Sequence, residues 1–268
     1  MLARAHRHRP PRPRLRRARL YVAGAVVLLA SCRRYPPRDD GGAPAPSATP
    51  VIAPASAPSP TTRVGPSLIT HREAFALADV QVSIEDVHMS THLDELQRKT
   101  SAAVVINGGF FDPAGEPVGL AVSGGIPLSP PRPGLSGGVV WVRDGLAHQT
   151  ASEEYGETQV DFAIQCRPRL VVGSRVNIRS DDGRRSERTV LCLRDGGRTL
   201  EVMIAKAVLE HPPPTLFELA EELRASGCEE ALNLDGGPST GWASPADGGT
   251  TFVSPRAPVR HAVVVRRR

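Results

Sequence analysis

The chain has few cysteines and lacks the short motifs that mark several common classes of protein. Its four cysteines form no Cys-x-x-Cys pair, which argues against a structural zinc site. The stretch DGGPSTG (235–241) has no lysine where a P-loop requires one, and no His-Glu-x-x-His motif occurs. No repeat of solenoid or propeller length is present either. The sequence therefore argues against zinc fingers, P-loop NTPases and repeat proteins.

Long hydrophobic runs are also scarce. The run LYVAGAVVLLAS near the start has only 12 residues, too short to span a bilayer comfortably. Residues 1–19, which precede it, carry eight arginines and no acid. This order predicts a secretory signal over residues 1–31. The run continues into LLASC, which resembles a bacterial lipobox and implies cleavage before Cys32 and acylation of that residue. Ordinary signal cleavage and an uncleaved anchor are the alternatives.

The positive net charge of the chain comes from its first residues. The whole chain has 33 Lys and Arg, of which eight lie in residues 1–31, so 25 remain against 28 acids and the net charge becomes −3. Proteins that bind a nucleic-acid backbone have basic patches in their folded part, so no nucleic-acid partner is expected. The protein is expected to be exported and attached to a membrane of the bacterial cell envelope through its N-terminal lipid.

Proline marks off the next segment. Residues 32–66 contain nine prolines, with alanine, serine, threonine and glycine filling most of the rest. Such a composition cannot bury enough apolar surface to offset chain entropy, so it predicts a disordered tether. The remaining residues, 67–268, have the length of one domain with a single hydrophobic core.

Three cysteines lie in that domain: Cys166, Cys192 and Cys228. Export makes a disulfide permissible. Cys166 and Cys192 lie in adjacent predicted strands and are the favoured pair. Three small buried thiols are the alternative, because no spacing enforces pairing.

Short runs rich in valine and isoleucine, bounded by Gly, Pro, Asp or Ser, predict strands. They cover residues 80–87, 102–106, 118–122, 138–142, 160–165, 169–172, 188–193, 200–205, 231–234 and 261–265. One helix is predicted to begin at Thr91, and another has Thr215 and Glu218 as a capping box and Gly227 as its end. The expected fold is α+β: a mixed, largely antiparallel sheet core with a few covering helices.

Each predicted helix leads into a strand that ends in glycines. The run SAAVVINGGFFD (101–112) ends in Asn107, Gly108 and Gly109, and EEALNLDGGPSTGW (229–242) ends in Asn233, Leu234, Asp235, Gly236 and Gly237. Glycines let a ligand approach the backbone, and consecutive amides can bind an anion. Tight turns are the alternative, because Asn-Gly and Asp-Gly favour hairpins.

Four blocks carry a resemblance to a known family. They are AVVINGGFFDPAGEPVGLAVSGG (103–125), FAIQCRPRLVV (162–172), ERTVLCL (187–193) and ELRASGCEEALNLDGGPST (222–240). In this order they resemble the phosphodiester glycosidases related to N-acetylglucosamine-1-phosphodiester alpha-N-acetylglucosaminidase. The resemblance implies hydrolysis of the bond between a sugar's anomeric carbon and a phosphate esterified to a second group. A phosphate monoester leaves as a stable anion because its second pKa is about 6, so phosphate stabilisation matters more than a general acid.

The resemblance also implies phosphate binding by the amides of the two glycine pairs and by Arg188. Arg188 lies in the block that resembles the family's Arg-Thr strand, and its guanidinium suits phosphate oxygens. A solvated surface arginine is the alternative. Pro238 stands where the family commonly has a glycine, and it removes one N–H. Ser239 and Thr240 are expected to cap the loop or contact the phosphate. A role for either as nucleophile is the alternative, and it is less favoured because no histidine lies in a recognisable partner motif.

Asp235 is the carboxylate expected to face the anomeric carbon, as nucleophile or as the base that aligns water. Asp112 and Glu116 are candidates for a second catalytic carboxylate, and an Asx-type turn is the alternative for Asp112. Asn107 and Asn233 are expected to hydrogen-bond sugar hydroxyls or to orient Asp235, with loop structure as the alternative.

No cofactor is firmly predicted. If a divalent cation binds, Asp112 and Asp235 are the favoured ligands and would hold it against the phosphate. His88 and His92 are less favoured as ligands, because they straddle a predicted strand end. Two other functions fit the same residues. One is a lipid-anchored binder of anionic glycans without turnover, and the other is a metal-dependent phosphodiesterase that cleaves P–O instead of C–O.

Overall fold

The computed structural model describes residues 67–208 and 212–268. The predicted signal (1–31), the acylated Cys32 and the tether (32–66) lie outside the described residues. Within those two ranges, neither α-helix has the length and apolar character needed to cross a membrane.

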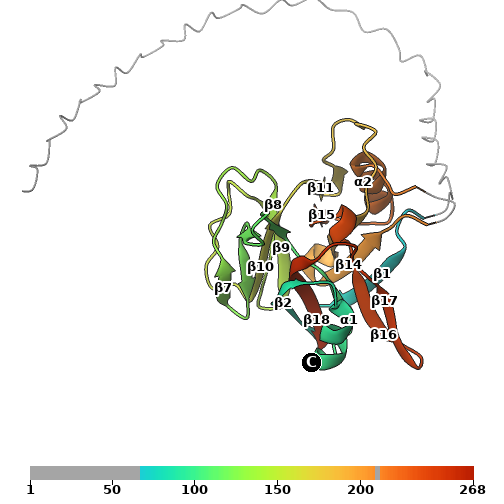
Figure 1. The fold of residues 1–268 in the computed structure, drawn as a ribbon. Coiled ribbons are helices and arrows are strands. Elements are labelled where there is room, and N and C mark those ends of the chain that lie inside the picture. Colours follow the sequence, from blue (N-terminus) through green and yellow to red (C-terminus); the bar gives the residue numbers. More distant parts are fainter. Residues whose placement is uncertain (1–66, 209–211) are drawn as a thin grey trace, which may run out of the picture. The chain divides into compact units, whose positions relative to one another are not determined.

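Three antiparallel sheets and a short hairpin make up the described part of the chain (Figure 1). The first sheet has the order β1 (His71–Ala76), β14 (Thr199–Ala205), β13 (Arg188–Arg194), β15 (Glu230–Asn233), β11 (Arg169–Val172), β12 (Arg175–Val176). The second has the order β7 (Ile126–Ser129), β6 (Ala121–Ser123), β10 (Phe162–Cys166), β8 (Gly138–Arg143), β9 (Leu146–Ala151). The third has the order β17 (Gly249–Val253), β16 (Trp242–Ala246), β3 (Val104–Asn107), β18 (Val259–Arg267), β2 (Val80–Ser90). The hairpin pairs β4 (Phe110–Phe111) with β5 (Pro117–Val118).

The main hydrophobic core forms where the three sheets face one another. It contains Leu191 of β13, Ile164 of β10 and Ile106 of β3, all of which are buried. Because each sheet contributes side chains to this core, the ends of strands from different sheets come close together around it. The candidate site lies at such a meeting point.

One helix covers the outer face of each of two sheets (Figure 1). Helix α1 (Leu93–Thr100) packs its buried Leu93 on the third sheet, and α2 (Leu216–Ala225) packs Leu219 and Leu223 on the first. The predicted capping box of Thr215 and Glu218 on α2 is confirmed. Helix α1 begins two residues later than predicted, after His92.

The expected fold class gives the helices too much weight. The described residues are largely β, with two α-helices, and every strand pair found among them is antiparallel. The single mixed sheet is therefore a wrong prediction, although a largely antiparallel core with covering helices is right. The order of strands depends on long-range pairing, which runs of valine and isoleucine do not encode.

The predicted pairing of Cys166 with Cys192 is also wrong. Cys192 of β13 forms a disulfide with Cys228, which directly precedes the residues that lead into β15, and the two Cα atoms are 5.7 Å apart. Cys166 is a buried free thiol at the end of β10. Cys166 belongs to the second sheet and Cys192 to the first, so they are not neighbours in one sheet as expected.

Candidate functional site

The two strand ends that carry glycines meet in the structure. The side-chain amide of Asn107, at the end of β3, donates a hydrogen bond to the backbone oxygen of Asp235 (2.8 Å). The N–H of Asp235 in turn donates to the backbone oxygen of Gly108 (3.3 Å). The segment after β3 and the segment after β15 are thus held together, although they extend from different sheets.

Asn107 holds this junction from inside the protein. Its side chain is fully buried, and its Oδ1 accepts hydrogen bonds from the Thr189 hydroxyl (2.6 Å) and the Gly241 N–H (3.2 Å). With a donor and two acceptor contacts engaged, Asn107 orients the Asp235 segment and is not placed to bind a sugar hydroxyl.

Beside this junction lies a cavity of about 460 Å³. It is lined by Phe110, Ser136, Arg167, Pro168, Ser186, Arg188, Leu216, Asn233, Leu234, Asp235, Gly236, Gly237 and Pro238. Five of the predicted site residues therefore line one cavity: Arg188, Asn233, Asp235, Gly236 and Gly237. Its only charged lining residues are Asp235, Arg188 and Arg167.

Asp235 is the carboxylate of this cavity. Burial raises its pKa above the usual aspartate value, while hydrogen bonds from the Ser239 side chain and the Gly236 N–H act in the opposite direction. The Gly236 contact to Oδ1 measures 2.9 Å. Ser239 therefore contacts the predicted catalytic carboxylate, whereas Thr240 is fully buried and does not line the cavity.

Arg188 begins β13 and lines the same cavity as a half-buried cation. Its Nε is buried without a hydrogen-bond partner, and burial lowers the pKa of its guanidinium. Among the described residues, no carboxylate forms a salt bridge with it. A buried cation without a partner is costly, so this one is suited to an anion supplied by a ligand.

Asn233 provides an acceptor on the same wall. It is 4 % exposed, and its amide nitrogen donates to the backbone oxygens of Arg167 (3.0 Å) and Leu234 (2.8 Å). Its Oδ1 is buried without a partner in the described structure. Because the donor end is fixed, the oxygen is held ready to accept a hydrogen bond from a ligand hydroxyl.

Three of the four glycine amides in the predicted anion site are engaged within the protein. The N–H of Gly108 donates to His261 O (2.7 Å), that of Gly236 to Asp235 Oδ1, and that of Gly237 to Glu187 O (2.7 Å). These three donors are therefore already used, which leaves the Gly109 N–H as the only one of the four without an assigned partner among the described residues. The glycines are needed for close packing instead, since a Cβ on Gly236 would lie 2.7 Å from Glu187 O.

Asp112 and Glu116 are not brought into the cavity. Asp112 Oδ1 accepts hydrogen bonds from the N–H groups of Ala114 (2.9 Å) and Glu116 (3.0 Å), which is the Asx-type turn considered as its alternative. Glu116 is exposed, and neither residue lines the cavity. The structure therefore does not place either predicted second carboxylate beside Asp235 in this cavity.

Arg167 was not among the predicted site residues, and its neighbour Cys166 was predicted only as a disulfide partner. Arg167, in the turn after β10, is exposed and lines the cavity. Cys166 directly precedes it and is fully buried, and burial followed by the charge of Asp235 raises the pKa of its thiol, while the backbone of Phe110 and Asp235 acts in the opposite direction. The sequence signal for both is their place at a strand end beside a proline in FAIQCRPRLVV.

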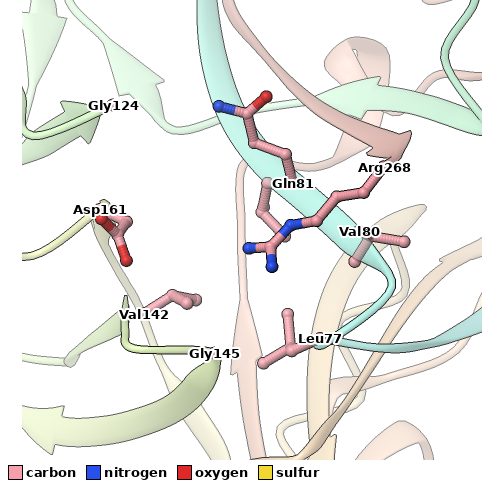
Figure 2. A pocket seen from close by; sticks show the side chains of 9 residues that line it. Leu77, Val80, Gln81, Gly124, Val142, Gly145, Asp161 and Arg268 are labelled. Atoms are coloured by element: carbon pink, nitrogen blue, oxygen red, sulfur yellow. The ribbon is translucent and has the colours of Figure 1, made fainter.

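Two other kinds of feature among the described residues could mark a binding site: a metal-binding cluster and a second pocket. No group of three or more His, Cys, Asp or Glu there is arranged to hold a metal ion. Figure 2 shows a separate pocket of about 280 Å³, into which Arg268 extends over Leu77 and Val80 on the side facing Asp161. None of the predicted catalytic or binding residues lines this second pocket.

Comparison with known proteins gives one family. Residues 100–266 match the family model described as phosphodiester glycosidase, which is more than half of the chain. No curated protein matches the chain.

Two solved structures share the fold. One is the catalytic domain of zebrafish N-acetylglucosamine-1-phosphodiester alpha-N-acetylglucosaminidase, auto-inhibited by its pro-peptide, with 18% identity and a TM-score of 0.57. The similarity covers 72% of this chain and 74% of that one. The other is a hypothetical protein from Synechocystis, with 16% identity and a TM-score of 0.54 over 74% of this chain and 59% of that one. At these identities the likeness shows the fold.

The junction at Asn107 generates a stability prediction. Asn107→Asp keeps the acceptor oxygen but loses the donor to Asp235 O and places a charge in a buried position. We expect the free energy of unfolding to fall by about 1–3 kcal/mol or more, measured by urea denaturation. Asn177→Asp is the matched control, because the exposed Asn177 amide also donates to a backbone oxygen, that of Arg169 (2.9 Å). Equal effects of the two changes would contradict the role given to Asn107.

Proposed function

The chain belongs to the phosphodiester glycosidase family, and we propose that it hydrolyses the glycosidic C–O bond of a sugar 1-phosphodiester. The substrate proposed is of the GlcNAc-phosphodiester kind, because the zebrafish protein of the same fold carries that activity in its name. Export and lipid attachment at Cys32 would place the reaction at the bacterial cell envelope. That location is proposed from the basic and apolar order of residues 1–31 and from the LLASC stretch that ends at Cys32.

One observation carries the proposal: a half-buried arginine without a salt bridge lines the same cavity as a half-buried carboxylate. Arg188 can bind phosphate oxygens through its planar donors, while Asp235 supplies the charge that an oxocarbenium-like carbon needs. Opposite charges in one cavity that do not form a salt bridge with each other are suited to a ligand with an anionic group next to an electrophilic carbon.

The chemistry requires only one carboxylate in the cavity. The leaving group is a phosphate monoester, which departs as an anion without a general acid. The role left for the protein is to stabilise that anion, which falls to Arg188, and to attack or align water, which falls to Asp235. The Ser239 side chain and the Gly236 N–H orient the Asp235 carboxylate, and the free Oδ1 of Asn233 accepts from a sugar hydroxyl.

The bond that breaks can be identified with labelled water. We expect the protein to hydrolyse the propyl phosphodiester of GlcNAc in ¹⁸O water and to place the label in the sugar, detected by mass spectrometry. Asp235→Asn should fold normally and lose at least about 10²-fold in kcat. Label in the phosphate, with activity lost to chelator, would establish the metal-dependent phosphodiesterase instead. Tight binding of the diester without turnover would establish the non-catalytic binder.

The raised pKa of Asp235 sets the pH dependence of that activity. Asp235 acts as an anion, so kcat/KM should fall as pH falls through its pKa, at a pH above the ordinary aspartate value of 3.8. Stability should change in the opposite sense. Because the pKa in the folded protein is raised, ionisation disfavours folding, and stability declines as pH rises from 3.8 through that pKa. Asp235→Asn should lack this decline, measured by urea denaturation at each pH.

Arg188→Lys tests the phosphate contact. Lysine keeps the charge but cannot form two parallel hydrogen bonds to a phosphate group, so we expect kcat/KM to fall about 10- to 100-fold. Arg175→Lys is the control, because Arg175 is exposed on β12 and does not line the cavity. Unchanged kinetics in Arg188→Lys would remove Arg188 from phosphate binding.

A further inference from the structure

Arg167 is held at the exposed side of the candidate site by contacts on both faces of its turn. Its backbone oxygen accepts the hydrogen bond from the buried amide of Asn233 (3.0 Å), two residues before Asp235 in the chain. Gly137 also packs closely against it, since a Cβ on Gly137 would lie 2.6 Å from the Cβ of Arg167. The position of Arg167 relative to the Asp235 segment is therefore fixed by the protein core, although its side chain reaches solvent.

The guanidinium of Arg167 has no partner of its own. It forms no salt bridge or side-chain hydrogen bond with any of the described residues, and the remaining cavity wall apart from Arg188 and Asp235 is uncharged. A phosphodiester group carries one negative charge, and the half-buried Arg188 matches it. Arg167 then stays as a second and more exposed cation of the same cavity, available to a group carried by the alcohol part of the phosphodiester.

We propose that Arg167 forms a subsite for a second anionic group, carried by the alcohol part of the phosphodiester. Preferred substrates would be sugar phosphodiesters whose alcohol part has a further phosphate or carboxylate a few bonds from the reacting phosphate. A guanidinium binds either group through parallel hydrogen bonds. The inference rests on the proposed function, because it assumes that the reacting phosphate binds at Arg188.

Three diesters of GlcNAc 1-phosphate test this subsite. One has a propyl group, one a 3-phosphopropyl group and one a 3-carboxypropyl group, and kcat/KM is measured for each. The wild-type protein should prefer at least one charged diester over the propyl diester by about tenfold, the scale of one charge-assisted hydrogen bond. Arg167→Gln should bring that ratio close to one. Arg175→Gln, which removes the same charge from an exposed position on β12, should leave the ratio at its wild-type value.

Two results would overturn the subsite. One is a ratio of kcat/KM, charged diester over propyl diester, that is the same in the wild-type protein and in Arg167→Gln. The other is an equal loss of kcat/KM on all three diesters, which would assign Arg167 to the reacting phosphate. Which charged diester is preferred distinguishes phosphate from carboxylate recognition.

Failure of the proposed function is a different result, in which the wild-type protein hydrolyses none of the three. Calorimetric titration of the same diesters then decides the subsite. Tighter binding of a charged diester that Arg167→Gln abolishes would keep it, and equal Kd values in the two proteins would overturn it.

Discussion

The geometry of the candidate site depends on one buried amide. Asn107 ends a strand of the third sheet, yet its side chain contacts Thr189 in the first sheet, the backbone of Asp235 and the N–H of Gly241. A fully buried polar group is tolerated when its partners are in place, so these contacts form together or not at all. The carboxylate of Asp235 is consequently positioned by the packing of two sheets, and its own loop contributes the local orientation.

The loop that follows Asp235 uses its amides to hold itself together. Gly237 donates to Glu187, Ser239 to Gly236 and Thr240 to Gly237, while Pro238 has no N–H to give. These backbone donors are thereby occupied, whereas the side chains of Arg167 and Arg188, which line the cavity, form no salt bridge among the described residues. Guanidinium groups retain their charge at any accessible pH, so titration of the site is left to Asp235.

Local features could be predicted from the sequence, and long-range ones could not. Strand β11 was predicted at residues 169–172 as found, and the capping box at Thr215 is present, because both depend on neighbouring residues. Strands β9 and β17 are polar or exposed along much of their length, so no hydrophobic run marks them. The division into three sheets, the partner of Cys192 and the place of Arg167 in the cavity depend on contacts between distant segments. The turn at Asp112 is local, and the dipeptide Asp-Pro already indicated it as an alternative.

The disulfide between Cys192 and Cys228 ties together the two strands that carry Arg188 and Asn233. In a strand, side chains alternate between the two faces, so sliding of one strand by a single residue would put Arg188 and Asn233 on opposite faces of the sheet. The covalent link next to the pairing of Cys192 with Ala231 prevents such a slip. In a reducing compartment the two thiols would stay separate and this restraint would be missing. The relative position of Arg188 and Asn233 therefore depends on the redox state of the compartment in which the chain folds.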